Sequence, residues 1–241
     1  MKTTDYISFK IDRLPRGYVF TYDDFYTKVK KKEAIIKALN RMVASGKIAK
    51  LSRGKFYKQE ITPFGELQPS QKQVVKDLLE KDGKTIGYLT GLSIYNELGL
   101  STQVSNVIQI GRNSISPELK RGKYTVRFVR QKNIITQDNI PQLQLLDALR
   151  FIKTIPDSGL ERSLTRCIAL IFELDNEQIR NMVRLAKKYP PSTRALLGSI
   201  LEVLGLADIA EPLRASLNPV TTYRLLNVTE LLPTTKAWNF E

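Results

Sequence analysis

The 241-residue sequence predicts an α+β protein built from three successive parts. Apolar residues at helical spacing, followed by two short apolar runs around a glycine, predict a helix-and-hairpin unit in residues 1–62. Alternating strand-like runs beside helical stretches predict a mixed α+β part in residues 69–135, and leucine-rich helical patterns fill residues 136–241. Two prolines and a glycine in residues 61–69 predict a linker between the first two parts.

The first part contains three expected helices. The first covers residues 3–13 and ends before Pro15 and Gly17. Thr21, with an acid three residues later, is the expected N-cap of a short second helix. In the third helix, apolar residues at positions 35, 36, 39, 42 and 43 share one face, and Gly46 is the expected stop.

A β-hairpin is expected after the third helix. Residues 47–51 and 55–58 form its two runs, and Gly54 can take the positive φ that a tight turn needs. Phe56 and Tyr57 are expected to pack inside the hairpin rather than to stack on bases. Helix, turn, basic helix and hairpin is the order of a winged helix-turn-helix, which places its second helix in the major groove of DNA.

The basic residues of this part predict a DNA interface. We expect Lys37, Asn40 and Arg41 to reach base edges, since Asn pairs with adenine and Arg with guanine through two hydrogen bonds each. The alternative for these three residues is an ordinary solvated helix face. Phosphate contacts are expected from the basic residues that begin the helix and from those on the hairpin: Lys31, Lys32, Lys50, Arg53 and Lys55.

The formal net charge of +14 is concentrated in the first half of the chain. Residues 1–60 hold 15 Lys and Arg against 6 Asp and Glu, residues 61–135 hold 11 against 6, and residues 136–241 hold 12 against 12. Phosphate contacts dominate nucleic-acid affinity. This charge gradient therefore favours a first half of the chain that faces an anion and a second half that faces something else.

The middle part, residues 69–135, is expected to begin with a helix that ends at residues 82–83. Ser70 and Gln73 form its expected capping box. A second short helix over 91–98, capped by Gly99, and two strands over 104–110 and 124–130 complete this part. A basic run in this part consists of Lys120, Arg121, Lys123, Arg127, Arg130 and Lys132. It is either a solvated edge strand or a second contact with nucleic acid or an acidic protein.

The last part is expected to be a small antiparallel helical bundle. A solenoid-like stack is the weaker alternative, because no fixed-period repeat is present. Balanced charge favours a protein-facing or structural role, and the tail from residue 218 to 241 has no predicted structure. The expected helices cover residues 141–154, 158–172, 176–189, 190–204 and 206–216.

Composition argues against catalysis. The sequence has no histidine, one cysteine, and neither glycine-rich phosphate loop, so we expect no metal, no cofactor and no enzymatic activity. Cys167 lies in an apolar helical run and is expected to be a buried structural thiol. A single cysteine, no signal peptide and no membrane-spanning stretch favour a cytoplasmic protein.

The order of several short motifs resembles the AbiEi-like antitoxins of bacterial abortive-infection systems. The motifs are GYVFT at 17–21, ALNRMV at 38–43, GKI at 46–48, LSRGKFY at 51–57 and LTGLSIYNELGLSTQ at 89–103. The resemblance implies a winged helix that binds inverted repeats in its own promoter. It also implies that the protein counteracts a cognate nucleotidyltransferase-type toxin in the type IV manner, without a stable complex between the two.

Two alternatives stay open beside this DNA-binding antitoxin and transcriptional autoregulator. The winged helix can serve as an adaptor that binds protein instead of DNA, since a fold by itself does not determine function. A stand-alone transcriptional regulator without a toxin partner is the other. The DNA sequence read and the oligomeric state do not follow from the sequence.

Overall fold

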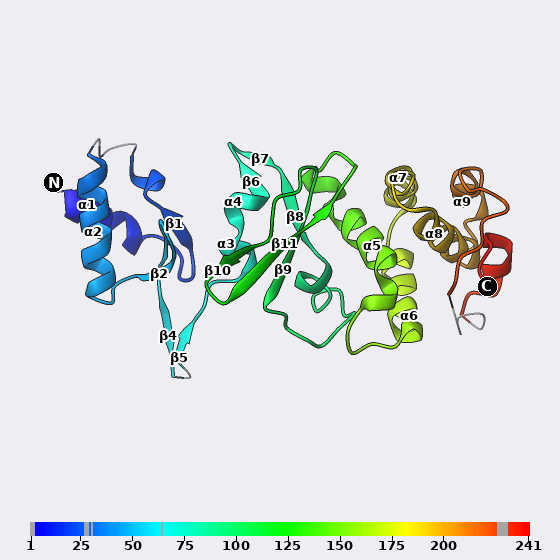
Figure 1. Ribbon diagram of the computed structural model, residues 1–241, viewed down its shortest axis with the longest axis horizontal. Helices are drawn as coiled ribbons and strands as arrows, with labels where there is room; N and C mark the ends of the chain where they lie inside the picture. The colour runs from blue at the N-terminus through cyan, green and yellow to red at the C-terminus, as the bar shows by residue number, and fades with distance from the viewer. Residues whose placement is uncertain (1–2, 27–28, 30, 64, 226–230) are drawn as a thin grey trace. The chain divides into compact units, whose positions relative to one another are not determined.

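The computed structural model describes residues 3–26, 29, 31–63, 65–225 and 231–241 (Figure 1). By its internal contacts the chain divides into two compact units. The N-terminal unit consists of Met1–Asp77 and Leu119–Tyr124, and the C-terminal unit of Leu78–Glu118 and Thr125–Glu241. Both units contain helices and strands, so the α+β class is confirmed.

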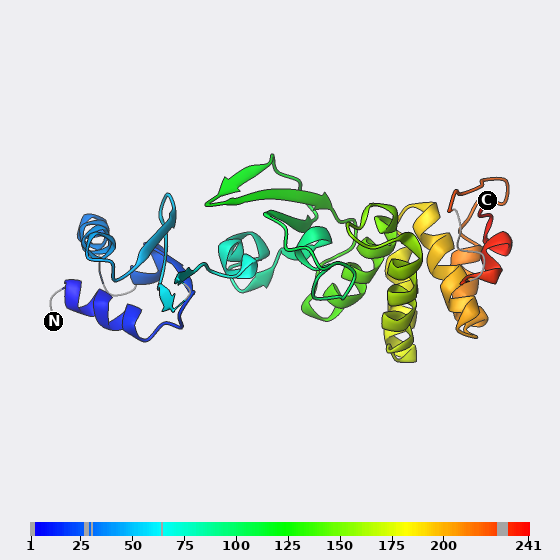
Figure 2. The same cartoon turned by 90° about the horizontal axis from the view of Figure 1, so that it is seen from below.

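In the N-terminal unit, helices α1 and α2 accompany a small antiparallel sheet with the strand order β1-β3-β2. Figure 2 shows α1 and α2 together at the blue end of the ribbon. Further along the chain come a hairpin and a short helix. In chain order the elements of this unit are α1 (Thr3–Asp12), β1 (Val19–Thr21), the 3₁₀ turn η1 (Asp23–Phe25), α2 (Lys32–Ala44), β2 (Ala49–Ser52), β3 (Lys55–Tyr57), β4 (Glu60–Thr62), β5 (Gly65–Leu67), α3 (Gln71–Val74) and β10 (Leu119–Arg121).

The core of this unit follows the apolar spacing of the sequence. Ile7 of α1 and Ile35 of α2 are fully buried, because each lies on the apolar face of its helix. Three phenylalanines fill the space next to the sheet: the Phe20 and Phe25 rings meet edge-on at 5.8 Å, and Phe20 stacks on Phe56 at 6.2 Å. Phe56 is fully buried and Tyr57 is 4% exposed, which confirms that both pack within the protein.

The expected second helix is only the 3₁₀ turn η1. The expected Thr21 N-cap is wrong, because Tyr22 is the N-cap residue of this turn and Thr21 ends β1. The Thr21 hydroxyl still accepts from the backbone N–H of Asp23, and the Asp24 carboxylate accepts from the backbone N–H of Thr21. The bond to Asp23 satisfies one of the N–H groups that the start of a helical turn leaves unpaired. Residues 27, 28 and 30, which lie between η1 and α2, are outside the described residues.

The linker expected at residues 61–69 is wrong, because much of this stretch belongs to the β4–β5 hairpin. Glu60 pairs with Leu67 and Thr62 with Gly65, which gives backbone groups of this surface segment their partners. The hairpin is also attached to the sheet: the Tyr57 hydroxyl donates to Glu66 and accepts from Gln68. Burial, together with Glu66, raises the pKa of Tyr57 to about 12.

The helix expected to run from Ser70 to residues 82–83 is interrupted. The Ser70 hydroxyl accepts from the backbone N–H of Gln73 as predicted, but the Gln73 side chain accepts from Val19 instead of completing a capping box. The helix ends at Val74, and a second short turn, α4 (Lys76–Leu79), follows.

The C-terminal unit begins with a tight hairpin where the helix was expected to end. Strands β6 (Glu80–Lys81) and β7 (Lys84–Thr85) pair around Asp82 and Gly83, which both have positive φ. Two successive residues with positive φ are typical of a type I′ turn, for which an Asp-Gly pair is favoured.

The next strands of this unit form a mixed sheet in which β9 lies between β8 and β11. β8 (Gly87–Thr90) is antiparallel to β9 (Val107–Arg112), and β11 (Tyr124–Arg130) is parallel to β9. The bounds predicted for β11 are confirmed. The helix expected over 91–98 is instead a 3₁₀ turn, η2 (Gly91–Ser93), followed by irregular turns.

Residues 140–214 of the C-terminal unit are mainly helical, as predicted. α5 packs against β8, α6, α7 and α8, while α8 packs against α9 and the tail turn η5. In Figure 1 these helices follow the strands in green, yellow and orange, and η5 is red. Their bounds are η3 (Gln137–Asn139), α5 (Ile140–Arg150), η4 (Ile152–Thr154), α6 (Leu160–Phe172), α7 (Asn176–Ala186), α8 (Pro191–Val203), α9 (Ala207–Arg214) and η5 (Pro233–Trp238).

One hydrophobic core connects the strands and the helices of this unit. It extends from Tyr88 and Tyr95 through Leu146 of α5 and Ile200 of α8 to Trp238 in the tail. Residues 78–118 and 125–241 are therefore one body, a division different from the boundary expected at residue 135. Over the described ranges, no helix combines the length and the apolar character that crossing a bilayer requires.

Candidate nucleic-acid interface

Helix α2 presents a polar outer face opposite its buried face. Ile35, Ala38, Leu39 and Met42 are buried, and the residues between them project outward at the 3.6-residue period. The exposed set contains all five residues predicted for this helix and its first turn: Lys31, Lys32, Lys37, Asn40 and Arg41. Asn40 and Arg41 follow Lys37 by three and four residues, so both side chains are neighbours of Lys37 on the helix surface.

These side chains are not used for the fold. Within the described part of the chain, none of the five has a side-chain hydrogen bond or a carboxylate within 4.0 Å. An ordinary solvated helix face also has exposed polar side chains without protein partners. The geometry of α2 is therefore compatible with a DNA contact and with a solvated face at Lys37, Asn40 and Arg41. Glu33, one turn before Lys37, is the exposed acid of this helix.

The β2–β3 hairpin carries two of its three predicted phosphate contacts on the surface. Lys50 and Arg53 are exposed, and Gly54 makes the tight turn with a φ of +75°. Lys55 does not fit the prediction, because its ammonium lies 2.6 Å from the Asp77 carboxylate and its side chain is only 17% exposed. Burial outweighs the attraction of Asp77 and lowers the pKa of Lys55. Lys55 holds the hairpin to α4, and its ammonium is already paired instead of being free for a phosphate.

Asp77 is the centre of a cluster that also contains Arg121. The Arg121 guanidinium donates to both carboxylate oxygens of Asp77, at 2.5 and 2.7 Å, and to the backbone carbonyl of Val74 at 2.9 Å. Burial by itself raises the pKa of Asp77, but hydrogen bonds from Arg121 and Lys55 outweigh it, and the pKa is lowered. Lys55 and Arg121, more than sixty residues apart in the sequence, therefore share one counter-ion.

This cluster predicts a loss of stability in acid. Because folding lowers the pKa of Asp77, its contribution is fully present above the unfolded pKa of about 4 and disappears as the pH falls through the folded value. We expect the difference in urea midpoint between wild type and Asp77→Asn to be constant near neutral pH and to shrink below about pH 4. A difference that stays constant down to pH 2 would contradict the role assigned to Asp77.

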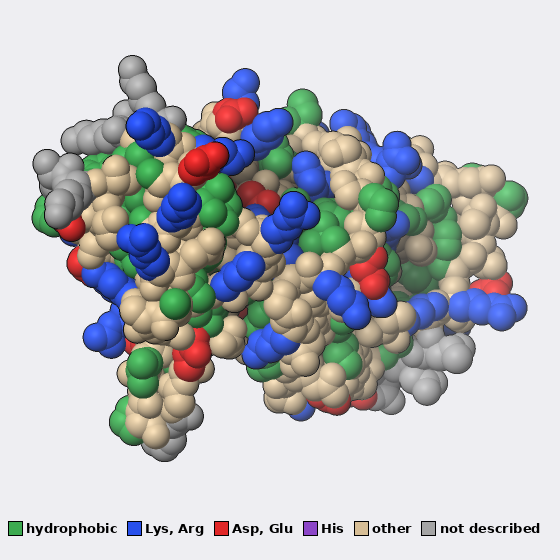
Figure 3. Space-filling view, turned by 60° about the vertical axis from the view of Figure 1, so that its left-hand side comes forward, with side chains coloured by type: hydrophobic (Ala, Val, Ile, Leu, Met, Phe, Trp, Pro, Cys, Tyr) green, Lys and Arg blue, Asp and Glu red, His purple; other side chains and the backbone are tan. Residues whose placement is uncertain are grey.

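Other basic residues of the N-terminal unit also have structural roles. Lys47 forms a 2.8 Å ion pair with Asp12 and a hydrogen bond with Ser8. The Lys58 ammonium donates to the backbone carbonyls of Asp12 and Leu14. The net charge of this unit therefore overestimates the number of cationic side chains that a ligand can contact. Figure 3 shows Lys and Arg side chains dispersed over one face of the molecule with few acidic side chains between them.

The basic run at residues 120–132 does not form one surface. Arg121 is buried against Asp77, and Arg127 pairs with Glu118 at 2.6 Å. Lys123 lies over the ring of Tyr124 at 5.3 Å. The last two members, Arg130 and Lys132, line a cavity in the C-terminal unit. The run is therefore divided among several local environments.

A buried polar network lies in the C-terminal unit, and the sequence analysis missed it. Asp147 is 1% exposed and accepts hydrogen bonds from the hydroxyls of Tyr88, Thr90 and Tyr189 at 2.7, 2.7 and 2.9 Å. Gln131 donates to both tyrosine hydroxyls. Burial raises the pKa of Asp147, although the three hydroxyl bonds oppose the shift.

The titratable groups of the network and the nearby thiol are shielded from solvent. Burial and the adjacent Asp147 raise the pKa values of Tyr88 and Tyr189. Cys167 is fully buried, which confirms the expected structural thiol, and burial raises its pKa to about 12. Among the described residues, no three Asp, Glu, His or Cys side chains lie close enough to hold a metal ion.

Comparison with known proteins identifies a fold relative and a family. A crystal structure of the RV2827C protein from Mycobacterium tuberculosis is similar, with a TM-score of 0.55 and 16% sequence identity, over 91% of this chain and 83% of that chain. At this identity the likeness shows a shared fold alone. No curated protein sequence matches. The model of DUF6088, a family of unknown function, matches residues 6–200, and the chain therefore belongs to the DUF6088 family.

Proposed function

We propose that this protein is a DNA-binding antitoxin and transcriptional autoregulator whose N-terminal unit is a winged helix-turn-helix. The element order α1, β1, η1, α2, β2, β3 and the sheet order β1-β3-β2 support this assignment. In such a module α2 would be the recognition helix in the major groove, and the β2–β3 hairpin would be the wing beside it.

One observation carries the proposal: exposed basic residues without counter-ions are present on both α2 and the hairpin. Among the described residues, Arg41 on the helix and Arg53 at the hairpin turn have no carboxylate partner, whereas Lys47 and Lys55 of the same unit do. Guanidinium groups left without an internal partner can bind phosphates and guanine edges. We assign base reading to Lys37, Asn40 and Arg41 and phosphate binding to Lys31, Lys32, Lys50 and Arg53.

A salt titration of the full chain tests DNA binding. With about six phosphate contacts, affinity for duplex DNA should fall by about 10³-fold between 50 and 200 mM salt, because binding releases counter-ions from the DNA. The full chain is required, since residues 119–124 belong to the N-terminal unit and a fragment ending at residue 62 lacks them. Binding that does not change with salt, or none at low salt, would favour the protein-binding adaptor instead.

Two arginine variants separate base reading from phosphate binding. Arg41→Ala should reduce discrimination between the protein's own promoter and a scrambled duplex by about 1–3 kcal/mol, the value of a bidentate base contact. Arg53→Ala should weaken binding to both duplexes equally. Competition binding on the two duplexes measures the difference, and Arg162→Ala, an exposed arginine on α6, is the control. Equal losses on both duplexes for Arg41→Ala would place Arg41 among the phosphate contacts.

The antitoxin half of the proposal rests on the resemblance to AbiEi-like proteins. We expect a neighbouring gene to encode a nucleotidyltransferase-like protein. This protein should arrest growth when it is expressed alone, but not when it is expressed together with this chain. Growth arrest that persists on co-expression would leave a stand-alone transcriptional regulator as the better description. Arg41→Ala should keep rescue intact if DNA binding and toxin relief are separate activities.

A further inference from the structure

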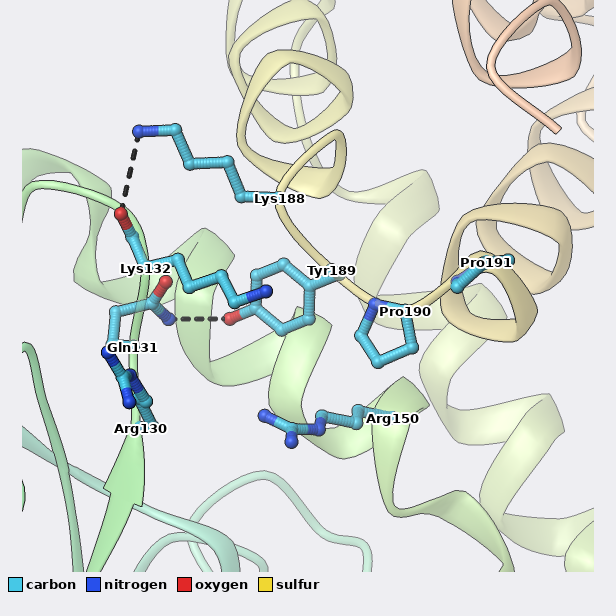
Figure 4. Close-up of a pocket in the computed structure, with 8 residues that line it drawn as sticks. All are labelled: Arg130, Gln131, Lys132, Arg150, Lys188, Tyr189, Pro190 and Pro191. Carbon is cyan, nitrogen blue, oxygen red and sulfur yellow. Dashed lines mark hydrogen bonds between the residues drawn. The ribbon is translucent and has the colours of Figure 1, made fainter.

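A cavity of about 250 Å³ opens in the C-terminal unit where three segments meet. They are the end of β11, the end of α5, and the turn between α7 and α8. Figure 4 shows Arg150 pointing from α5 toward the strand segment that carries Arg130 and Gln131. The lining residues are Arg130, Gln131, Lys132, Arg150, Lys188, Tyr189, Pro190 and Pro191.

The lining is strongly cationic. It contains two arginines and two lysines, all exposed, and no acidic residue. In the part of the chain that the structure describes, none of these four cations has a carboxylate within 4.0 Å. Like charges that converge on one concave site repel one another, so the site favours an anion that neutralises several of them.

The backbone segments that carry these four cations are held in place by the buried hydrogen-bond network around Asp147. Gln131, Tyr189 and Asp147 are each at most 7% exposed and are joined by hydrogen bonds of 2.8 and 2.9 Å. Arg130 and Lys132 flank Gln131 in the sequence, Lys188 precedes Tyr189, and Arg150 follows Asp147 by one helical turn. The network thus fixes the backbone that carries every cation, which lowers the cost of ordering the site when a ligand binds.

The neutral polar groups of the lining are already used. Gln131 donates to two tyrosine hydroxyls and accepts from Asn133, while the Tyr189 hydroxyl donates to Asp147. The cavity therefore offers charge and few uncommitted neutral hydrogen-bonding groups, and it selects a ligand by negative charge. Helix α8 begins at Pro191 on the cavity wall, so the positive end of its dipole adds to the same field.

We propose that this cavity binds the di- or triphosphate group of a small molecule. Phosphate oxygens suit the arginine fork and the lysine ammonium alike, and a chain of two or three phosphates carries enough charge for four cations. A cavity of 250 Å³ is close to the lower limit of small-ligand pockets, about 300 Å³, and fits a compact anion. All of its lining residues belong to the C-terminal unit, and none belongs to α2.

Calorimetric titration of the full-length protein with sodium tripolyphosphate tests this assignment. One equivalent should bind, pyrophosphate should bind more weakly, and orthophosphate more weakly still, in the order of their charge. Lys132→Gln with Lys188→Gln should weaken tripolyphosphate binding at least about tenfold, because each replacement removes a charged hydrogen bond. The matched control, Lys84→Gln with Lys187→Gln, removes two exposed lysines of the same unit that are outside the lining and should bind like wild type.

Circular dichroism melts of both double variants verify that they remain folded, which is expected because all four lysines are exposed. The proposal is overturned if wild type shows no saturable binding at about 1 mM tripolyphosphate. It is equally overturned if the cavity variant and the control weaken to the same extent. Loss of duplex-DNA affinity in the cavity variant, without any tripolyphosphate binding in wild type, would assign these lysines to nucleic acid instead.

Discussion

Asp147→Ala is expected to lower the free energy of unfolding by about 3–5 kcal/mol, because it removes the acceptor shared by three buried hydroxyls. Tyr88, Thr90 and Tyr189 are each at most 7% exposed, so water cannot replace the lost carboxylate without opening the core. Urea unfolding of the full chain, followed by circular dichroism, measures the loss.

Two further variants identify the cause. Asp147→Asn retains the shape and one carbonyl acceptor, so its loss should be smaller than that of alanine. Asp138→Ala removes an exposed acid of η3 and should change stability by less than about 0.5 kcal/mol. A loss below about 1 kcal/mol for Asp147→Ala would mean that the hydroxyls find other partners and that the network does not hold the cavity wall.

Trp238→Ala is expected to cost about 3–5 kcal/mol, since this ring is 1% exposed and its removal leaves a large hole. The ring lies against Gly198 of α8, under the Arg214 guanidinium at 4.4 Å, and its indole N–H donates to Glu202. Arg214 also pairs with Glu202 at 2.8 Å, which connects α8, α9 and the tail. Thermal and urea unfolding report the loss, and the wild-type transition can be followed by fluorescence of this single tryptophan.

Gly198→Ala provides the reciprocal test. An ideal Cβ at position 198 would lie 2.1 Å from the Trp238 ring, so alanine must displace the ring and destabilise the protein. The same change in a Trp238→Ala background should cost much less, because the clash is gone. Gly159→Ala, where a Cβ meets open space, should cost at most about 1 kcal/mol. Additive losses for positions 198 and 238 would contradict the contact between the two.

Local sequence patterns were sufficient to predict the helices and strands whose apolar residues repeat with the same period as their buried face. α1 and β11 were predicted within about a residue of their bounds, and the buried face of α2 and the turn at Gly54 were predicted as well. In these elements the buried face repeats at 3.6 or 2 residues, and each repeat is visible in a short window. The buried Cys167 was predicted on the same basis.

Pairing between distant segments was not visible in such windows. The β4–β5 hairpin was taken for a linker because Pro63 and Gly65 within it, and Pro69 just after it, are also typical of loops. Lys55 and Arg121 were taken for surface charges, since nothing near either residue in the sequence shows that both bind Asp77. The tail could not be assigned because Trp238 is ordered by Gly198 and Glu202, which lie more than thirty residues earlier.

The residues of the candidate DNA interface could be predicted from the sequence, whereas those of the cationic cavity could not. By itself, the sequence determined the α+β class, the polar outer face of α2, and the exposed residues Lys37, Asn40 and Arg41, because one amphipathic helix carries all of them. Only the tertiary structure brought Arg130, Arg150 and Lys188 to one cavity. Three separate segments supply these residues, and buried hydrogen bonds among Gln131, Asp147 and Tyr189 hold the segments together, a relation that no local periodicity encodes.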